Sequence, residues 1–345
     1  MRSPLVCYLG WHGQGNIGDD AIREAVGSAL HGARFVDLPL EPRLIATSMA
    51  QGLPHRLKDS TLVLGGGTCI GRRNWRHLVR FGLALARGQP GFAIGVGVED
   101  PAFRGHRSYS DRGELGRWPN VLKQFQSVSV RGPRSAELLS GVGVEASVVG
   151  DPALLLPRPQ VEVRPGRIGV NFGFGDDLWG HDPAFVAGEM AAACRELHAL
   201  DYEIVGILMS GQDRKWLEWA LSGVSGQMTF VNASDSSQVI SELARCSVVI
   251  VSRLHAAILA SISGTPTVAL EYQPKCRDFA LSIDNGASLI RTDTVTAGEI
   301  VEHVNAALNE RELRSKRTLG AVDRLRDRLI SAYGATRDSL GLPKL

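Results

Sequence analysis

Arg253 and His255 are the residues whose types and spacing most directly suggest chemistry. They lie between a run rich in Val and Ile, residues 247–252, and a run with helical apolar spacing, residues 254–263. Parallel sheets bind ligands at such strand-to-helix turns, where the helix N-terminus offers free N–H groups to an anion. We therefore favour an anion site with acid–base chemistry over the alternative of a surface arginine and a space-filling histidine.

A glycine-rich loop follows the first predicted strand. Gly13, Gly15 and Gly18 fit G-x-G-x-x-G, and Asp37 follows about 20 residues later, as in dinucleotide-binding proteins. Two adjacent carboxylates at the start of the next helix would repel a pyrophosphate bound there. This argues against the dinucleotide interpretation without removing it.

The same loop suits a neutral ligand with many hydroxyl groups. Asn16 and Asp19 can exchange hydrogen bonds with sugar hydroxyls, and the glycines allow close approach. The alternative is a tight turn before a helix that Asp19 or Asp20 caps. Sugar binding and a purely structural turn remain equally open at this point.

The ends of two further predicted strands carry candidate ligand-binding residues. Residues 61–70, TLVLGGGTCI, run from a strand into glycines, and Gly66 and Gly67 there would let a ligand or another backbone approach closely. Arg131 follows the strand SVSV just as Arg253 follows its own strand. We expect these two arginines, one per domain, to face each other across an interdomain cleft.

The alternation of strands with helices of ten or more residues predicts an α/β protein with a mostly parallel sheet in each half. A length of 345 residues favours two domains. We expect two Rossmann-like domains facing a cleft: residues 1–157, a proline-rich linker at 158–165, and residues 166–310, followed by a charged amphipathic helix at 311–345.

The predicted C-terminal helix combines many basic residues with one apolar face. We expect it to pack on the body of the protein, with contact to a membrane surface, at its inner face, as the alternative. The apolar face consists of Leu319, Val322, Leu325 and Leu329.

The composition excludes several classes of protein. Lys and Arg number 38 against 36 Asp and Glu, so a net charge of +2 argues against nucleic acid as a partner. The five cysteines form no C-x-x-C pair and are expected to be buried thiols of a reducing compartment. No hydrolase motif or metal-ligand cluster is present, so no metal site is predicted. Since no apolar run approaches the ~20 residues of a membrane span, we expect a cytoplasmic protein.

Five motifs occur in one order along the chain: GNIGDDA at 15–21, LGGGT at 64–68, SVRGPRS at 129–135, GDPAL at 150–154, and SRLHAAI with EYQPK at 252–275. Together they resemble the polysaccharide pyruvyl transferase family, from the N-terminus to about Asp278. The resemblance implies a fold similar to the GT-B glycosyltransferases. It also implies transfer of the enolpyruvyl carbon skeleton of phosphoenolpyruvate to a sugar, typically as a cyclic pyruvate ketal, with release of phosphate. Many family members have an acidic residue after SVR where this chain has Gly132, which leaves the partners of the Arg131 loop open.

The Arg-Leu-His element matches the family's proposed phosphoenolpyruvate site, which makes the C-terminal domain the donor side and the N-terminal domain the acceptor side. Ketal formation needs a proton on the methylene carbon of phosphoenolpyruvate, so that C2 becomes electrophilic. His255 is the candidate general acid, because an adjacent phosphate and carboxylate can raise a pKa that is ordinarily near 6.5.

The remaining residues that the resemblance brings to the site are anion ligands and carboxylates. Arg253 and Arg131 would bind the phosphate and carboxylate of the donor, a task that suits the guanidinium group. Lys275 would add charge, and Glu271 or Asp151 would deprotonate or orient an acceptor hydroxyl. The expected partners are phosphoenolpyruvate and a saccharide or glycolipid acceptor of the cell envelope or an exopolysaccharide, with no cofactor.

Three other functions stay open. A GT-B glycosyltransferase using a nucleotide sugar shares the fold, although such donors usually meet small residues and a ribose-binding carboxylate where this chain has Arg253 and His255. A dinucleotide-dependent oxidoreductase depends on the glycine pattern alone. A non-catalytic carbohydrate-binding module predicts no dependence on His255.

Overall fold

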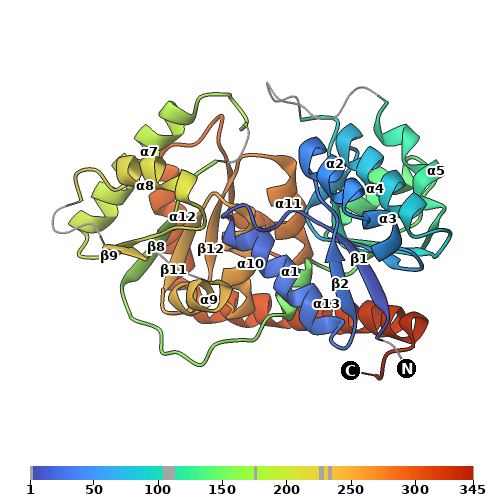
Figure 1. The fold of residues 1–345 in the computed structure, drawn as a ribbon. Helices are drawn as coiled ribbons and strands as arrows, with labels where there is room; N and C mark the ends of the chain where they lie inside the picture. Colours follow the sequence, from blue (N-terminus) through green and yellow to red (C-terminus); the bar gives the residue numbers. More distant parts are fainter. Residues whose placement is uncertain (1–2, 104–112, 175–176, 225–228, 232–234, 345) are drawn as a thin grey trace.

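The computed structural model describes residues 3–103, 113–174, 177–224, 229–231 and 235–344. Within these residues the chain forms two separate sheets whose strands pair in parallel, and helices flank each sheet (Figure 1). The predicted α/β fold with two Rossmann-like domains is confirmed.

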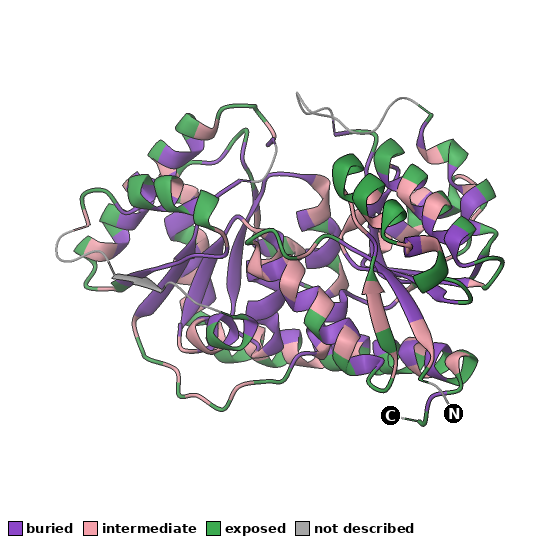
Figure 2. Ribbon diagram, viewed as in Figure 1, coloured by how far each residue is buried: buried purple, intermediate pink, exposed green. Residues whose placement is uncertain are grey.

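The N-terminal sheet has the strand order β2-β1-β3-β5-β6-β7, with β4 paired to β5. Its central strands are buried along their whole length, which explains their continuous apolar sequences. Figure 2 shows these buried strands beneath helices with exposed outer faces. The strands are β1 (Leu5–Leu9), β2 (Arg34–Asp37), β3 (Thr61–Gly65), β4 (Thr68–Ile70), β5 (Gly91–Val98), β6 (Phe125–Val130) and β7 (Ser147–Val148).

The C-terminal sheet has the strand order β10-β9-β8-β11-β12-β13. The central strand β11 pairs with β8 and β12, so that the turn after it lies in the middle of the carboxyl edge. The strands are β8 (Arg167–Asn171), β9 (Glu203–Ile207), β10 (Thr229–Val231), β11 (Val248–Val251), β12 (Thr267–Glu271) and β13 (Leu289–Arg291).

The helices of the two domains follow their strands in sequence. Those of the N-terminal domain are α1 (Ile17–Ala29), α2 (Pro42–Ala50), α3 (Leu53–Arg56), α4 (Arg73–Leu85), α5 (Pro119–Leu122) and α6 (Pro133–Ser140). Those that follow are α7 (Pro183–Ala199), α8 (Arg214–Ala220), α9 (Ser236–Ala244), α10 (Leu254–Ile262), α11 (Pro274–Ser282), α12 (Ala297–Asn309) and α13 (Arg311–Leu340). Short 3-10 turns include η2 (Pro152–Leu155) and η3 (Gly211–Asp213).

The two domains share a packed interface at the N-termini of α1 and α10, which lie side by side in Figure 1. One apolar core includes Ile22 and Val26 of α1 together with Ile258 of α10. The backbone N–H of Ile17 donates to the carbonyl of Met209 in the other domain at 3.0 Å. The carboxyl edges of the two sheets are therefore held against each other.

The helix α13 belongs to both domains, since it runs beneath both sheets and ends beside the N-terminus (Figure 1). Its apolar face is buried, including Val322, Leu325 and Leu329. The guanidinium groups of Arg326, Arg328 and Arg337 donate to backbone carbonyls of the N-terminal domain, which gives these charges a structural role. This packing offers no support for membrane contact. Among the described residues, no helix has the length and apolar character required to cross a membrane.

Candidate active site

The turn from β11 to α10 holds the first two candidates as predicted. Arg253 is the N-cap residue of α10, and His255 lies in the first turn of this helix. The guanidinium of Arg253 donates to Asp213 Oδ1 from Nε at 2.9 Å and from Nη2 at 2.5 Å. Its backbone N–H donates to Asn171 Oδ1 at 3.2 Å. These contacts fix the arginine at the carboxyl edge of the sheet.

Arg131 reaches the same region from the other domain. Its side chain is 1% exposed, donates from Nη2 to Thr68 Oγ1 at 3.3 Å, and places Nη1 3.8 Å from Asp151 Oδ2. A Cβ at Gly97 would lie 2.5 Å from Arg131 Nη2. Only glycine in β5 therefore leaves room for the guanidinium to lie across this strand.

Asp151 lies between Arg131 and His255. Its Oδ1 accepts the backbone N–H of Ala153 at 3.0 Å, whereas its Oδ2 lies 3.9 Å from His255 Nε2. Within the described residues, Asp151 Oδ2, His255 Nε2 and Arg131 Nε are buried without a hydrogen-bond partner. Buried polar atoms normally have partners, so these three are suited to bind polar atoms of a substrate.

The pKa of His255 is lowered to about 3, first by burial and then by the positive charges of Arg131, Lys275 and Arg253. The imidazole is therefore neutral at pH 7 in the protein alone. The expectation of a protonated His255 requires the negative charge of a bound donor, because the protein's own cations act in the opposite direction.

Asn16 and Asp19 lie at the N-terminus of α1 and are bonded to each other. Asn16 is the N-cap, where Oδ1 accepts the N–H of Gly18 at 3.1 Å and Nδ2 donates to Asp19 Oδ2 at 2.6 Å. The prediction that Asp19 or Asp20 caps this helix is wrong, because the helix begins three residues earlier than Asp20, at Ile17. Asp20 instead accepts the N–H of Gly13 at 2.6 Å and closes the loop.

Two carboxyl groups of the site have raised pKa values. Burial raises the pKa of Asp19 to about 7, against the effect of Lys275 and Arg253 and with a smaller contribution from Asp151. Burial also raises the pKa of Asp151 to about 6, against the effect of Arg131. The charges in this region shift one another's pKa values, so the residues form one electrostatic cluster. Its members are Asp19, Asp151, Lys275, Arg131, Arg253 and His255.

Gly18 makes the approach of the two domains possible. A Cβ at this position would lie 2.2 Å from His255 Cβ, which is too close for any side chain. This contact also covers the helix N-terminus where a dinucleotide pyrophosphate would bind. Asp37, the carboxylate of the dinucleotide-binding pattern, forms an ion pair with Arg23, with 3.0 Å between Oδ1 and Nε. Its Oδ2 lies 3.5 Å from His12 Nε2.

A Gly18→Ala variant is expected to lose about 1–3 kcal/mol of stability, since an inserted methyl group must push α1 and α10 apart. Its activity should fall as well, because His255 is displaced. The matched control is Gly27→Ala in the same helix, where the added Cβ meets only Arg23 Nη1 at 3.0 Å. That variant should gain up to about 1 kcal/mol. Equal melting temperatures and activities for the two variants would contradict the packing argument.

The polysaccharide pyruvyl transferase family model matches residues 16–274. The chain belongs to the polysaccharide pyruvyl transferase family. No curated protein matches the chain significantly. Membership supports the transfer of pyruvyl groups to polysaccharides as the general activity.

Solved structures with similar folds include enzymes that act on nucleotide sugars. UDP-GlcNAc 2-epimerase from Neisseria meningitidis, bound to UDP-GlcNAc, has a TM-score of 0.60 at 11% identity, over 95% of this chain and 100% of that one. UDP-GlcNAc 2-epimerase from Methanocaldococcus jannaschii has a TM-score of 0.59 at 9% identity, with 89% and 93% covered. Anabaena HepE, in complex with UDP and glucose, has a TM-score of 0.55 at 11% identity, with 98% and 99% covered. At these identities the likeness establishes the GT-B-type fold and nothing further.

The other predicted residues of this pyruvyl transferase family member lie at the edge of the cluster or outside it. Gly66 and Gly67 have positive φ angles of 61° and 70° after β3, and a Cβ at Gly66 would lie 2.6 Å from Ile22. Gly66 therefore leaves room for Ile22 of α1, and Thr68, which follows the two glycines, binds Arg131. Glu271 ends β12, and both of its carboxylate oxygens accept hydrogen bonds from Arg277.

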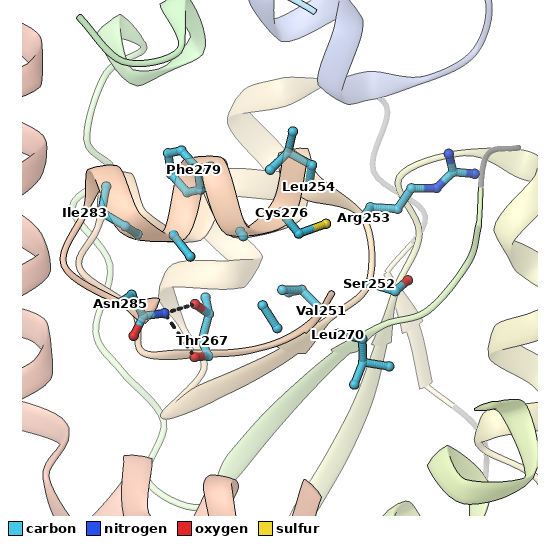
Figure 3. Close-up of a pocket in the computed structure, with 13 residues that line it drawn as sticks. Val251, Ser252, Arg253, Leu254, Thr267, Leu270, Cys276, Phe279, Ile283 and Asn285 are labelled. Carbon is cyan, nitrogen blue, oxygen red and sulfur yellow. Dashed lines mark hydrogen bonds between the residues drawn. The ribbon is translucent and has the colours of Figure 1, made fainter. Parts of the chain in front are cut away.

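The small pocket in Figure 3 lies beneath α10 and α11, next to the cluster. Apolar side chains such as Leu254, Phe279 and Ile283 line most of it, and Asn285 donates to Thr267 Oγ1 at 3.0 Å. The guanidinium of Arg253 points away from this space in Figure 3. The pocket is therefore a packing gap behind the site, with no charge to bind an anionic donor.

The buried partners of Arg253 in the C-terminal domain could not be identified from the sequence. Asp213 is fully buried, and a Cβ at Gly173 would lie 2.1 Å from its Oδ1. In the sequence Asp213 only marks the start of a helix. Its partner Arg253 lies forty residues further along the chain, so the pairing leaves no local pattern. The roles of Asn171 and Ser252 were not predicted either: Asn171 Oδ1 accepts the backbone N–H of Arg253, and Ser252 Oγ accepts that of Gly173.

Proposed function

We propose that this protein transfers the pyruvyl group of phosphoenolpyruvate to a saccharide acceptor of the cell envelope or an exopolysaccharide, forms a pyruvate ketal and releases phosphate. One observation carries the proposal. Cationic side chains from both domains, Arg131, Arg253 and Lys275, surround a buried histidine closely enough to lower its pKa. Phosphoenolpyruvate carries a phosphate and a carboxylate on one small carbon skeleton, and such a set of cations matches both anions.

Ketal formation requires two new C–O bonds at C2 of the donor, the first made by addition and the second by displacement of phosphate. A proton is added to the methylene carbon C3, and the first acceptor hydroxyl forms a bond to C2. The second hydroxyl then displaces phosphate from C2. The two hydroxyls lose two protons, which balance the proton taken up at C3 and the one that leaves with phosphate. The protein must therefore supply one group that donates a proton and one that accepts it.

His255 gains the proton for C3 when the donor binds. Burial and then the charges of Arg131, Lys275 and Arg253 keep the imidazole neutral, and the donor's negative charges offset those cations. The same charges oppose ionisation of Asp19 and Asp151, whose pKa values of about 7 and about 6 already lie near neutrality. Donor binding at pH 7 thus draws protons onto this cluster.

Asp151 is the carboxylate best suited to orient or deprotonate the acceptor. Its Oδ2 has no hydrogen-bond partner among the described residues and lies 3.9 Å from His255 Nε2. Glu271 is less suited, since Arg277 occupies both of its oxygens. Asn16 and Asp19, at the N-terminus of α1, would bind further acceptor hydroxyls.

Calorimetry at pH 7, in buffers of different ionisation enthalpy, tests this donor site. Phosphoenolpyruvate is expected to bind with net proton uptake, and His255→Gln should reduce the uptake. Arg253→Ala should weaken binding by about tenfold or more, since a charge-assisted hydrogen bond contributes about 1.5–3 kcal/mol. The control is Arg324→Ala, which removes an exposed arginine paired with Asp284. Binding of a UDP-sugar without any binding of phosphoenolpyruvate would favour the glycosyltransferase alternative instead.

A further inference from the structure

A buried polar contact joins the two domains beside the candidate donor site. Asp278 of α11 accepts the backbone N–H of Ser135 on Oδ1 at 3.1 Å and the Ser135 hydroxyl on Oδ2 at 2.6 Å. Ser135 Oγ in turn accepts the N–H of Val98, at the end of β5, at 3.1 Å. Asp278 is 3% exposed and Ser135 is 1% exposed, so that water does not compete for these bonds.

This contact lies between the elements that carry two of the three cations. Helix α6, which holds Ser135, begins at Pro133, two residues after Arg131. Helix α11, which holds Asp278, has Lys275 in its first turn. In Figure 1, α11 lies between the two domains. A fixed distance between α6 and α11 thus fixes Arg131 relative to Lys275.

The contact requires that residue 132 has no side chain. A Cβ at Gly132 would lie 2.2 Å from the backbone oxygen of Asp278 and 2.3 Å from its Oδ1. The φ angle of Gly132 is −146°, which any residue can adopt, so the glycine is required by the approach of Asp278 and not by its backbone conformation. A carboxylate from the other domain occupies the space that a side chain at 132 would need.

We infer that Asp278 is a positioning residue, which holds the Arg131 loop against α11 so that Arg131 and Lys275 are preset to bind one anionic donor together. This inference rests on the proposed phosphoenolpyruvate site. Two substitutions from opposite domains should then have the same effect. Asp278→Ala removes the acceptor for α6, and Gly132→Ala forces α11 away from it.

The alternative is that the contact only stabilises the interface. In that case the variants would lower the melting temperature and leave the affinity of the folded protein for the donor unchanged. A preset site predicts weaker donor affinity as well, because part of the binding free energy must then be used to bring Arg131 and Lys275 into position. Affinity measured well below the melting temperature separates the two roles.

The experiment measures the dissociation constant of phosphoenolpyruvate by calorimetry for the full-length protein and its variants. Asp278→Ala and Gly132→Ala should each weaken binding about tenfold, and Asp278→Asn should retain most of the affinity because an amide oxygen can still accept the Ser135 N–H. The controls are Asp284→Asn, an exposed acid just after α11, and Gly188→Ala, where an added Cβ meets nothing within 4 Å.

The outcomes are distinct. If the wild-type protein does not bind phosphoenolpyruvate, the proposed function fails and this inference fails with it. If the wild type binds and the Asp278→Ala and Gly132→Ala variants bind equally well, the proposed function stands and the positioning role is overturned. Should Asp278→Ala not fold, Gly132→Ala and Ser135→Ala provide the same comparison.

Discussion

Replacement of His255 by glutamine is expected to lower kcat for pyruvyl transfer by about 10²- to 10⁴-fold, the usual contribution of a general acid or base. Glutamine keeps much of the volume of the imidazole and can form hydrogen bonds, yet it cannot carry a proton to C3 of the donor. The stability of the protein should change little, because the imidazole it replaces is neutral in the folded protein.

Rates of phosphate release at saturating donor, together with melting temperatures, would check this result. His303→Gln is a suitable control, since this partly buried histidine lies in α12, outside the cluster. Full turnover by the His255 variant would remove the residue from the mechanism. It would also favour the interpretation of the chain as a carbohydrate-binding module.

Arg131→Ala should strongly destabilise the protein. The variant leaves the fully buried Asp151 without its cationic partner, a situation that costs about 3–5 kcal/mol. The pKa of Asp151, already about 6 with Arg131 in place, should rise further. A carboxyl group with a raised folded-state pKa stabilises the protein most at low pH and loses that contribution as the pH rises through the raised value. The deficit should therefore be smaller at pH 5 than at pH 8.

Denaturant unfolding at the two pH values measures this deficit. The double variant Arg131→Met with Asp151→Asn removes both charges and should recover most of the stability without recovering phosphate release. A loss of stability that does not depend on pH, or activity in the double variant, would contradict the assigned roles of this pair.

The local part of the site could be predicted from sequence because it depends on chain neighbours. The strand before Arg253 and the helix after it are β11 and α10, within one residue of the predicted ends. The apolar runs specify a buried strand and helix, and their junction must lie at the carboxyl edge of the sheet. Arg131 was found by the same logic at the end of β6.

The long-range part could not be predicted, since it depends on contacts between distant segments. Asp213 and Asp278 have the spacing of ordinary helix residues, and only the folded chain shows that they bind Arg253 and Ser135. The crossing of α13 to the N-terminal domain also leaves no periodic signal. The helix α2 was not predicted, and none of its residues is buried in the structure.

The most direct test of the account is NMR of the reaction in D₂O with phosphoenolpyruvate and a panel of saccharide acceptors. We expect phosphate release together with a new ketal methyl group that carries one deuterium, because C3 receives one deuteron from solvent by way of His255. Both signals should be absent from the His255→Gln variant. A product that keeps the vinyl protons of an enolpyruvyl ether, or sugar transfer from a UDP-sugar in place of pyruvyl transfer, would contradict ketal formation.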